Sequence, residues 1–129
     1  MASILVVEDV PAVLMSLKII LEGEGHKVTA AENGLRGIEM INKTDFDLVI
    51  TDIWMPGASG TDLIRESRRR SPQTPILAIT GGSPNQKAAV QNAPDAQEFG
   101  ADHVLQKPFE KKDLLAIVSK LARPHARAE

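Results

Sequence analysis

Short apolar runs, separated by stretches with helical periodicity, dominate the chain. Bulky leucine and β-branched side chains follow one another within each run, as they do in strands buried on both faces of a parallel sheet. The predicted strands cover residues 3–7, 27–31, 47–51, 75–80 and 101–107, and the second is the weakest. Because strands alternate with helices, we expect a parallel sheet covered by helices on both faces, with right-handed crossovers.

Helices are predicted between these strands, where apolar residues recur at spacings of three and four. The first runs from Pro11, which suits a first helical turn, to the helix-ending Gly23 and Gly25. Its apolar positions are Val10, Val13, Leu14, Leu17, Ile20 and Leu21. The second helix opens at Asn33 and Gly34 and has its apolar positions at Leu35, Ile38 and Ile41. The third helix follows a candidate N-cap at Ser59 and runs to about Arg70. The last helix covers residues 110–122.

Residues 81–99 are the least regular part of the sequence. A Gly-Gly-Ser-Pro stretch at residues 81–84 predicts a loop, and Pro94 would break any helix that passed through it. We therefore expect two short helical pieces there. Pro124 should end the last helix, which divides the chain into one domain, residues 1–123, and a tail, residues 124–129.

Composition narrows the class of protein. A chain of 129 residues with 43% hydrophobic and 25% charged residues fits one globular domain. The formal net charge of −2 provides no basic field for nucleic acid, and the absence of cysteine excludes disulfides, thiolate zinc sites and cysteine nucleophiles. The sequence has neither a signal-peptide pattern nor an apolar run near the ~20 residues that cross a bilayer, so we expect a cytoplasmic protein without a membrane partner.

Chemically active side chains follow the predicted strands. Asp52 follows the central run and precedes a Pro-Gly turn, and the first run ends in Glu8 and Asp9. The fourth run ends in Thr80 and the fifth in Lys107. In open α/β sheets, ligands bind at the carboxyl ends of the strands, so these side chains form a candidate site. Taken alone, Asp52 could also serve only as a cap for the turn that follows it.

The predicted strand order brings the acids together. We expect a doubly wound, five-stranded, flavodoxin-like sheet in the order 2-1-3-4-5, which places the first and third strands side by side. Glu8, Asp9 and Asp52 then converge, and three carboxylates repel one another unless a cation joins them. Oxygen ligands at an open site suit Mg²⁺. A carboxylate beside Mg²⁺ and Lys107 is equipped to attack phosphorus and form an aspartyl phosphate.

The motifs at these strand ends together resemble the receiver domain of two-component response regulators, in its single-domain, chemotaxis-regulator-like form. The resemblance covers essentially the full chain and rests on Glu8-Asp9, Asp52 with Met55-Pro56-Gly57, Thr80, and Lys107-Pro108-Phe109. It implies a signalling domain rather than an enzyme, one that switches conformation to control a downstream protein partner. It also implies a monomer or a phosphorylation-dependent dimer, and no direct nucleic-acid binding.

The resemblance assigns roles to individual residues. Asp52 would accept a phosphoryl group from a histidine kinase or a phosphotransfer protein. Mg²⁺ would be held by Asp52, directly by Asp9 with Glu8 nearby, and by the backbone carbonyl of Trp54.

The two remaining strand-end residues also receive roles from the resemblance. Thr80 would follow the phosphoryl group and Lys107 would pair with it. The Lys107–Pro108 peptide bond would be cis.

The sequence departs from the family pattern in two places. Val104 stands where receivers usually carry an aromatic residue that swings inward on activation. The spacing between Thr80 and Lys107 also exceeds the usual one by several residues, which must lie in residues 81–99. We therefore predict that output depends on a change of order or position in residues 81–99 rather than on a ring rotation. Whether the domain stands alone or was cut from a longer protein stays open.

Other classes of protein fit the sequence less well. Phosphatases of the haloacid-dehalogenase type also use an aspartate nucleophile and Mg²⁺, but they carry a second acid two residues after the nucleophile. This chain has Trp54 at that position. A nucleotide-binding module would need a Gly-rich loop after the first strand, where Glu8 and Asp9 stand instead.

Arginine, histidine and tryptophan side chains elsewhere in the chain offer weaker signals of function. Residues 68–70, three consecutive arginines, could indicate nucleic acid, but a solvated cluster at a helix end is favoured. The three histidines, His26, His103 and His125, show no metal spacing. Trp54 could contact a kinase or pack over its own loop.

Overall fold

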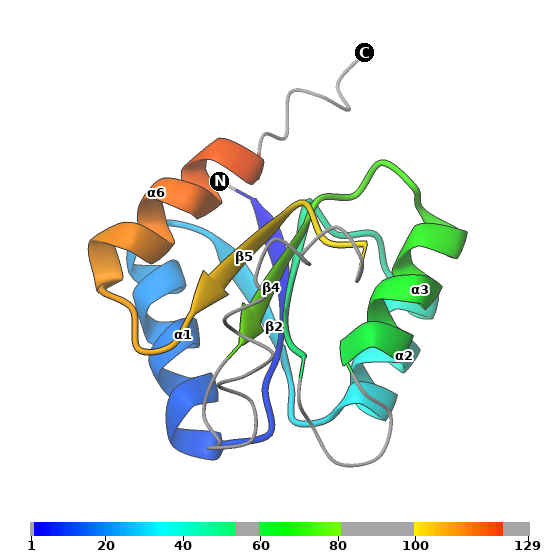
Figure 1. Cartoon of the computed structure of the whole chain (residues 1–129), viewed down its shortest axis with the longest axis horizontal. Coiled ribbons are helices and arrows are strands. Elements are labelled where there is room, and N and C mark those ends of the chain that lie inside the picture. The colour runs from blue at the N-terminus through cyan, green and yellow to red at the C-terminus, as the bar shows by residue number, and fades with distance from the viewer. Residues whose placement is uncertain (1, 54–59, 81–99, 123–129) are drawn as a thin grey trace.

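The computed structural model describes residues 2–53, 60–80 and 100–122 (Figure 1). Five strands lie in this part of the chain: β1 (Ser3–Val7), β2 (Lys27–Ala31), β3 (Leu48–Asp52), β4 (Ile76–Thr80) and β5 (His103–Gln106). The helices described with them are α1 (Pro11–Gly23), α2 (Gly34–Lys43), α3 (Gly60–Arg70) and α6 (Lys111–Leu121). None of these helices is long and apolar enough to span a membrane.

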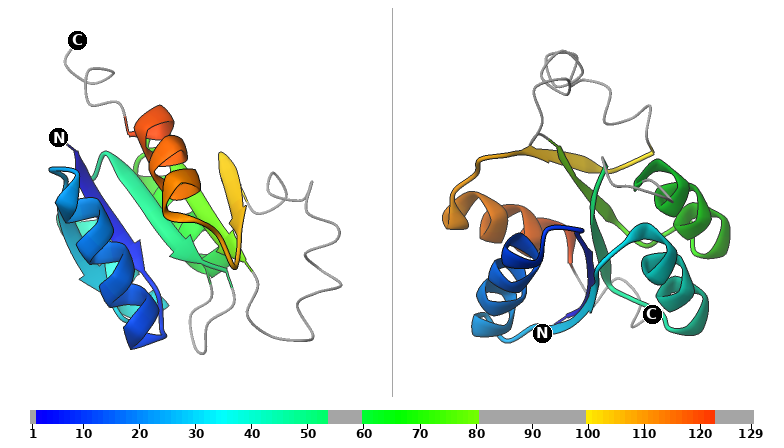
Figure 2. Two further views of the ribbon diagram at one scale, coloured as in Figure 1. Left: turned by 90° about the vertical axis from the view of Figure 1, so that its left-hand side faces the viewer. Right: turned by 90° about the horizontal axis from the view of Figure 1, so that it is seen from below.

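The strands form one parallel sheet in the order β2-β1-β3-β4-β5, which confirms the predicted fold class. Helices α1 and α6 cover one face, and α2 and α3 cover the other (Figure 2). Strand β1 lies next to β3, with Ile4 opposite Leu48 and Val7 opposite Thr51. The residues that follow β1 and end β3 therefore meet at one edge of the sheet.

Consecutive residues of the central strands pack into two different cores. Ile4 and Val6 of β1 contact the cluster under α1 and α6, whereas Leu5 and Val7 contact the cluster under α2 and α3. These four side chains are at most 1% exposed. Burying each one stabilises the fold by about 1.5–3 kcal/mol. This two-sided burial explains why the strands read as unbroken apolar runs in the sequence.

Two apolar residues predicted on helix faces are exposed instead. Val10 is 44% exposed because it precedes α1, and Leu35 of α2 is 62% exposed. The buried stripe of α2 consists of Gly34, Gly37 and Ile41, and successive helical residues point about 100° apart. Leu35 therefore faces away from the sheet. A Cβ on Gly37 would lie 2.5 Å from Leu63 Cδ1, so glycine lets α2 approach α3 closely.

Two of the three arginines at the end of α3 bond to other segments of the domain and do not form the predicted solvated cluster. Arg68 donates to the carbonyls of Pro72, Thr74 and Gly100 at 2.8–3.0 Å and pairs with Asp102 Oδ2 at 2.8 Å. Asp102 Oδ2 also accepts from the Ile76 amide at 2.8 Å. One guanidinium thus joins the end of α3 to the starts of β4 and β5.

The other two arginines of this group differ from each other. Arg70 donates to the Ile41 carbonyl and to Asp45, whereas Arg69 is 69% exposed and pairs with Glu66 within its own helix. The prediction that these arginines are solvated at the helix end is therefore right only for Arg69.

Some predictions fall outside the described residues. They are the Ser59 cap, the helical pieces within residues 81–99, and the tail after Pro124. Strand β3 has the predicted length but begins and ends one residue later than predicted, so it includes Asp52, whose carboxylate thus projects from regular sheet backbone.

Candidate functional site

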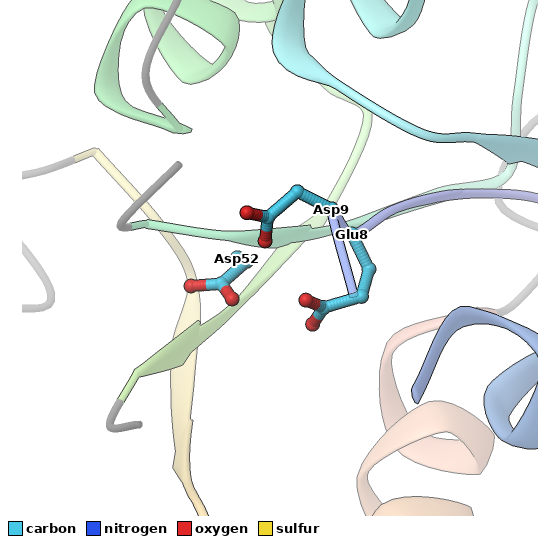
Figure 3. Close-up of side chains that lie close together, drawn as sticks. All are labelled: Glu8, Asp9 and Asp52. Atoms are coloured by element: carbon cyan, nitrogen blue, oxygen red, sulfur yellow. The ribbon is translucent and has the colours of Figure 1, made fainter. Parts of the chain in front are cut away.

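Three carboxylates meet at the carboxyl edge of the sheet (Figure 3). Glu8 and Asp9 directly follow β1, and Asp52 is the last residue of β3. One oxygen from each side chain lies within 4.8 Å of the others. The predicted convergence of these acids is therefore confirmed, and it follows from the pairing of β1 with β3.

Lys107 directly follows β5, an edge strand of the sheet, and its side chain contacts two of the acids. Its Nζ lies 3.0 Å from Glu8 Oε1 and 3.1 Å from Asp52 Oδ2. Its backbone amide donates to the Thr80 carbonyl at 2.8 Å, which continues the pairing of β4 with β5. The Lys107–Pro108 peptide bond is cis, as the family resemblance implies.

The site is buried, which governs its electrostatics. Glu8 is 1% exposed and Asp52 is 3% exposed. Removal from water raises the pKa of Glu8, against the hydrogen bonds that Glu8 accepts from Val10 and Lys107. Burial alone would lower the pKa of Lys107, but the hydrogen bond to Glu8 and the attraction of Asp52 outweigh it and raise that pKa. Lys107 therefore brings a positive charge into the acidic site.

Asp9 is the least buried of the three acids. It is partly exposed and lines a surface groove of about 630 Å³ that also includes Met15 of α1 and Glu32. Glu8, Asp9 and Asp52 offer only oxygen atoms, and three acids facing one lysine leave an excess of negative charge. This donor set fits a hard cation such as Mg²⁺. Trp54, whose carbonyl was predicted as a further ligand, lies outside the described residues.

Thr80 ends β4 beside the acids and is 6% exposed. Its neighbour Ile79 is the Cα partner of Asp52, so Thr80 lies one residue beyond the strand-end carboxylate. All of the predicted site residues that the structure describes therefore gather at this edge of the sheet.

Gly60 is a site residue that the sequence interpretation missed. A Cβ at this position would lie 2.2 Å from the Asp52 carbonyl oxygen and 2.6 Å from Ile53 Cα. The Gly60 amide also donates to the Ile53 carbonyl at 3.1 Å. Glycine thus allows α3 to begin directly against the backbone that carries Asp52. Its only sequence signal is a glycine in the loop after a strand, which is common in loops of every kind.

The histidines do not form a metal site in the described part of the chain, where Glu8, Asp9 and Asp52 are the one group able to hold a metal ion. His26 accepts a hydrogen bond on Nδ1 from the Ala2 amide at 3.1 Å. It therefore ties the start of β1 to the loop before β2.

Comparison with known proteins decides the family. The family model of the response regulator receiver domain matches residues 4–119. The chain is a response regulator receiver domain. The resemblance seen in the sequence is thereby confirmed, and with it the membership of a family of signalling domains of two-component systems.

Solved receiver structures share the fold of this receiver domain. A receiver domain protein from Clostridium thermocellum superposes with a TM-score of 0.86 at 29% identity, and the match covers 100% of both chains. The response regulator TrrA from Thermotoga maritima, solved in complex with Mg(2+)-BeF, superposes with a TM-score of 0.79 at 34% identity, covering 94% of this chain and 99% of TrrA.

Curated relatives are longer than this chain. An uncharacterized transcriptional regulatory protein, YkoG of Bacillus subtilis, is 32% identical over 120 residues, which cover 93% of this chain and 50% of YkoG. The cell cycle response regulator CtrA of Brucella ovis is 30% identical, with the same shares covered. The receiver domain thus spans about half the length of the curated relatives it matches.

Val104 takes the aromatic position of the family pattern on β5. It lies opposite Ala78 of β4 and packs, partly buried, against the apolar cluster under α2 and α3. Val104 therefore offers no aromatic ring that could rotate at this position.

Proposed function

We propose that this receiver domain accepts one phosphoryl group on Asp52 from a histidine kinase or a phosphotransfer protein, in a reaction that depends on Mg²⁺. The observation that carries the proposal is the position of the Asp52 carboxylate. It ends a central strand, it is buried, and it lies 3.1 Å from Lys107 Nζ and close to two further acids. A carboxylate used only as a turn cap would need neither the lysine nor the acids.

The reaction would proceed at an oxygen of Asp52. That oxygen attacks phosphorus, a new phosphorus–oxygen bond forms, and the phosphorus–nitrogen bond to the donor histidine breaks. The imidazole retains the electron pair of the broken bond. An ionised carboxylate is already nucleophilic, so this step requires no general base.

Neighbouring residues would assist by charge and hydrogen bonding. Lys107 would pair with a phosphoryl oxygen, and the Thr80 hydroxyl would donate to another. Asp9, Asp52 and the Trp54 carbonyl would hold Mg²⁺, with Glu8 beside them. When bound, Mg²⁺ supplies positive charge that reduces the repulsion between the acids and the incoming phosphoryl oxygens. The related TrrA was solved in complex with Mg(2+)-BeF, which supports the proposed need for Mg²⁺.

A protein donor would require a docking surface next to Asp9. Exposed apolar side chains follow Asp9 along the chain: Val10, which precedes α1, is 44% exposed, and Met15 and Ile19 of α1 are 56% and 61% exposed. Met15 and Asp9 line the same groove. We place the phosphodonor protein on this side of the domain because exposed apolar groups beside a polar site are typical of interaction surfaces.

The product would act as a signal rather than as a step in metabolism. Phosphorylation would bias the domain toward a form that controls a downstream protein, as a monomer or as a dimer. With Val104 in place of the aromatic residue, we propose an output without ring rotation. The predicted role of residues 81–99 lies outside the described residues and stays a prediction, as does the cytoplasmic location.

Labelling with a small phosphodonor tests the proposal. Acetyl phosphate and Mg²⁺ should add one phosphoryl group, seen by intact-protein mass spectrometry, and alkali or hydroxylamine should remove it as expected for an acyl phosphate. Asp52→Asn should abolish the label. Asp62→Asn is the matched control, since Asp62 is 49% exposed on α3, and it should label like the wild type. Full labelling of Asp52→Asn would refute the assignment.

A further inference from the structure

Thr51 is a polar residue of β3 on an apolar side of the sheet. It is 0% exposed and lies between Val7 of β1 and Ala78 of β4, its Cα partners. Side chains alternate along a strand, so Thr51 faces the same side as Val49, which packs in the apolar cluster under α2 and α3. Valine has nearly the same shape as threonine and is equally at home in a strand, so packing alone does not require the hydroxyl.

The Thr51 hydroxyl bonds to the backbone of the proposed phosphoacceptor. Its Oγ1 donates to the Asp52 carbonyl oxygen at 3.0 Å, and this bond is buried. Burying a hydroxyl is unfavourable unless it is hydrogen-bonded. The bond to Asp52 is therefore what makes a threonine acceptable on this side of the sheet.

The peptide unit between Asp52 and Ile53 is held at several points. Its oxygen accepts from Thr51, and its N–H, which belongs to Ile53, donates to the Ile79 carbonyl of β4 at 3.0 Å. Gly60 lies directly against the same oxygen, where any larger residue would clash. Because a peptide unit is planar, fixing its oxygen and its N–H fixes the orientation of the whole unit.

The orientation of this peptide unit controls where the Asp52 carboxylate points. Leu48 and Ile50 pack under α1 and α6, and Asp52 continues that alternation, so its side chain leaves the sheet on the face opposite to Thr51. A rotation of the peptide unit would tilt the Cα–Cβ bond of Asp52 and move the carboxylate away from Lys107 Nζ, now 3.1 Å away. In transfer reactions, a misplacement of about 1 Å can cost ~100-fold in rate.

We propose that Thr51 is a positioning residue for phosphoryl transfer: its buried hydroxyl holds the peptide unit between Asp52 and Ile53 and thereby aims the Asp52 carboxylate at phosphorus. The inference rests on the proposed function of Asp52. Thr51 acts through the backbone, from the other face of the sheet, and it is not a catalytic residue.

Two substitutions in the whole chain separate the hydroxyl from the methyl group of Thr51. Thr51→Val keeps the volume and removes the donor, and it should slow labelling by acetyl phosphate at saturating Mg²⁺ about fivefold. Thr51→Ser keeps the donor and should label within about twofold of the wild-type rate. A wild-type rate in Thr51→Val, or equal losses in both variants, would overturn the inference.

Ile41→Val is the matched control for packing. Ile41 of α2 is 3% exposed and belongs to the same apolar cluster under α2 and α3. This change loosens the cluster without removing a hydrogen bond. At a temperature where circular dichroism shows every variant to be folded, Ile41→Val should label within about twofold of the wild-type rate. If it slowed labelling as much as Thr51→Val does, looser packing would explain the effect and the inference would fall.

Hydrogen exchange tests the positioning without any phosphodonor. In Thr51→Val, the Ile53 amide should exchange about fivefold faster than in the wild type. The Val49 amide, which donates to the Pro75 carbonyl at 3.0 Å, is the reference in the same strand and should change less than about twofold. Unchanged exchange at Ile53, or equal acceleration at both amides, would overturn the inference. Failure of the proposed function would look different, because it appears as labelling of Asp52→Asn, whatever residue stands at position 51.

Discussion

At the scale of single residues, the backbone of β3 depends on the absence of a side chain at Gly60. Gly60→Ala would place a Cβ 2.2 Å from the Asp52 carbonyl oxygen, a contact that backbone atoms must relieve by moving. We expect a loss of about 1–3 kcal/mol in the free energy of unfolding, and slower labelling of Asp52, because the strand end shifts. Urea titration and acetyl phosphate labelling would measure the two effects.

Gly23→Ala is the matched control for Gly60→Ala. Gly23 ends α1, and a Cβ there would meet nothing within 4 Å. The added methyl group should leave stability unchanged or raise it by up to about 1 kcal/mol, because it restricts the unfolded chain. Equal losses for both variants would mean that the contact of Gly60 with β3 is not what requires glycine.

At the scale of secondary-structure elements, Arg68 holds the end of α3 against the entries to β4 and β5. Arg68→Ala would leave the carbonyls of Gly100 and Thr74 without this donor and would break the ion pair with Asp102. We expect a loss of about 1–3 kcal/mol in the free energy of unfolding. Arg68→Lys should recover only part of it, since an ammonium cannot reproduce the fork of donors.

The adjacent arginine is the control for this element contact. Arg69 is 69% exposed and pairs with Glu66 of the same helix, so Arg69→Ala should change stability by no more than about 0.5 kcal/mol. Both variants remove one positive charge from the same helix end. If Arg69→Ala lowered stability as much as Arg68→Ala does, the cause would be a general charge effect and not the contacts of Arg68 with β4 and β5.

At the scale of the whole molecule, stability should depend on pH through His26. Burial lowers the pKa of His26 from its ordinary 6.5, and its Nδ1 must be unprotonated to accept the Ala2 amide. The folded state therefore binds the proton less tightly than the unfolded chain. This contribution to stability is complete above pH 6.5 and is lost as the pH falls through the lower pKa of the folded state.

Urea titrations at a series of pH values below 6.5 would measure this dependence. His26→Gln offers an amide oxygen to the Ala2 amide and does not titrate, so it should flatten the decline in stability just below pH 6.5. His103→Gln, on β5, is the control, and it should leave the decline in stability that His26 causes unchanged. An unchanged slope in His26→Gln would show that other groups cause the decline.

The local sequence by itself determined the described strands and helices and the edge that carries the site, and the strand order followed from the doubly wound fold class that their alternation indicates. Unbroken apolar runs ending in Glu8, Asp52, Thr80 and Lys107 predict buried parallel strands, and the carboxyl ends of parallel strands share one edge whatever the details of packing. That is why the convergence of the acids and the lysine was predictable. The same local signals misplaced Leu35, because the close contact at Gly37 sets how α2 faces the sheet.

Only the tertiary structure decided which partners these residues have. Glu8 and Lys107 are 99 positions apart, and their 3.0 Å contact depends on how strands at opposite ends of the chain are placed. Arg68 and Gly100 are 32 positions apart, and the need for glycine at position 60 arises from the backbone of another element. Sequence periodicity reports which face of an element is apolar, but distances between separate elements come from the packing of the whole domain.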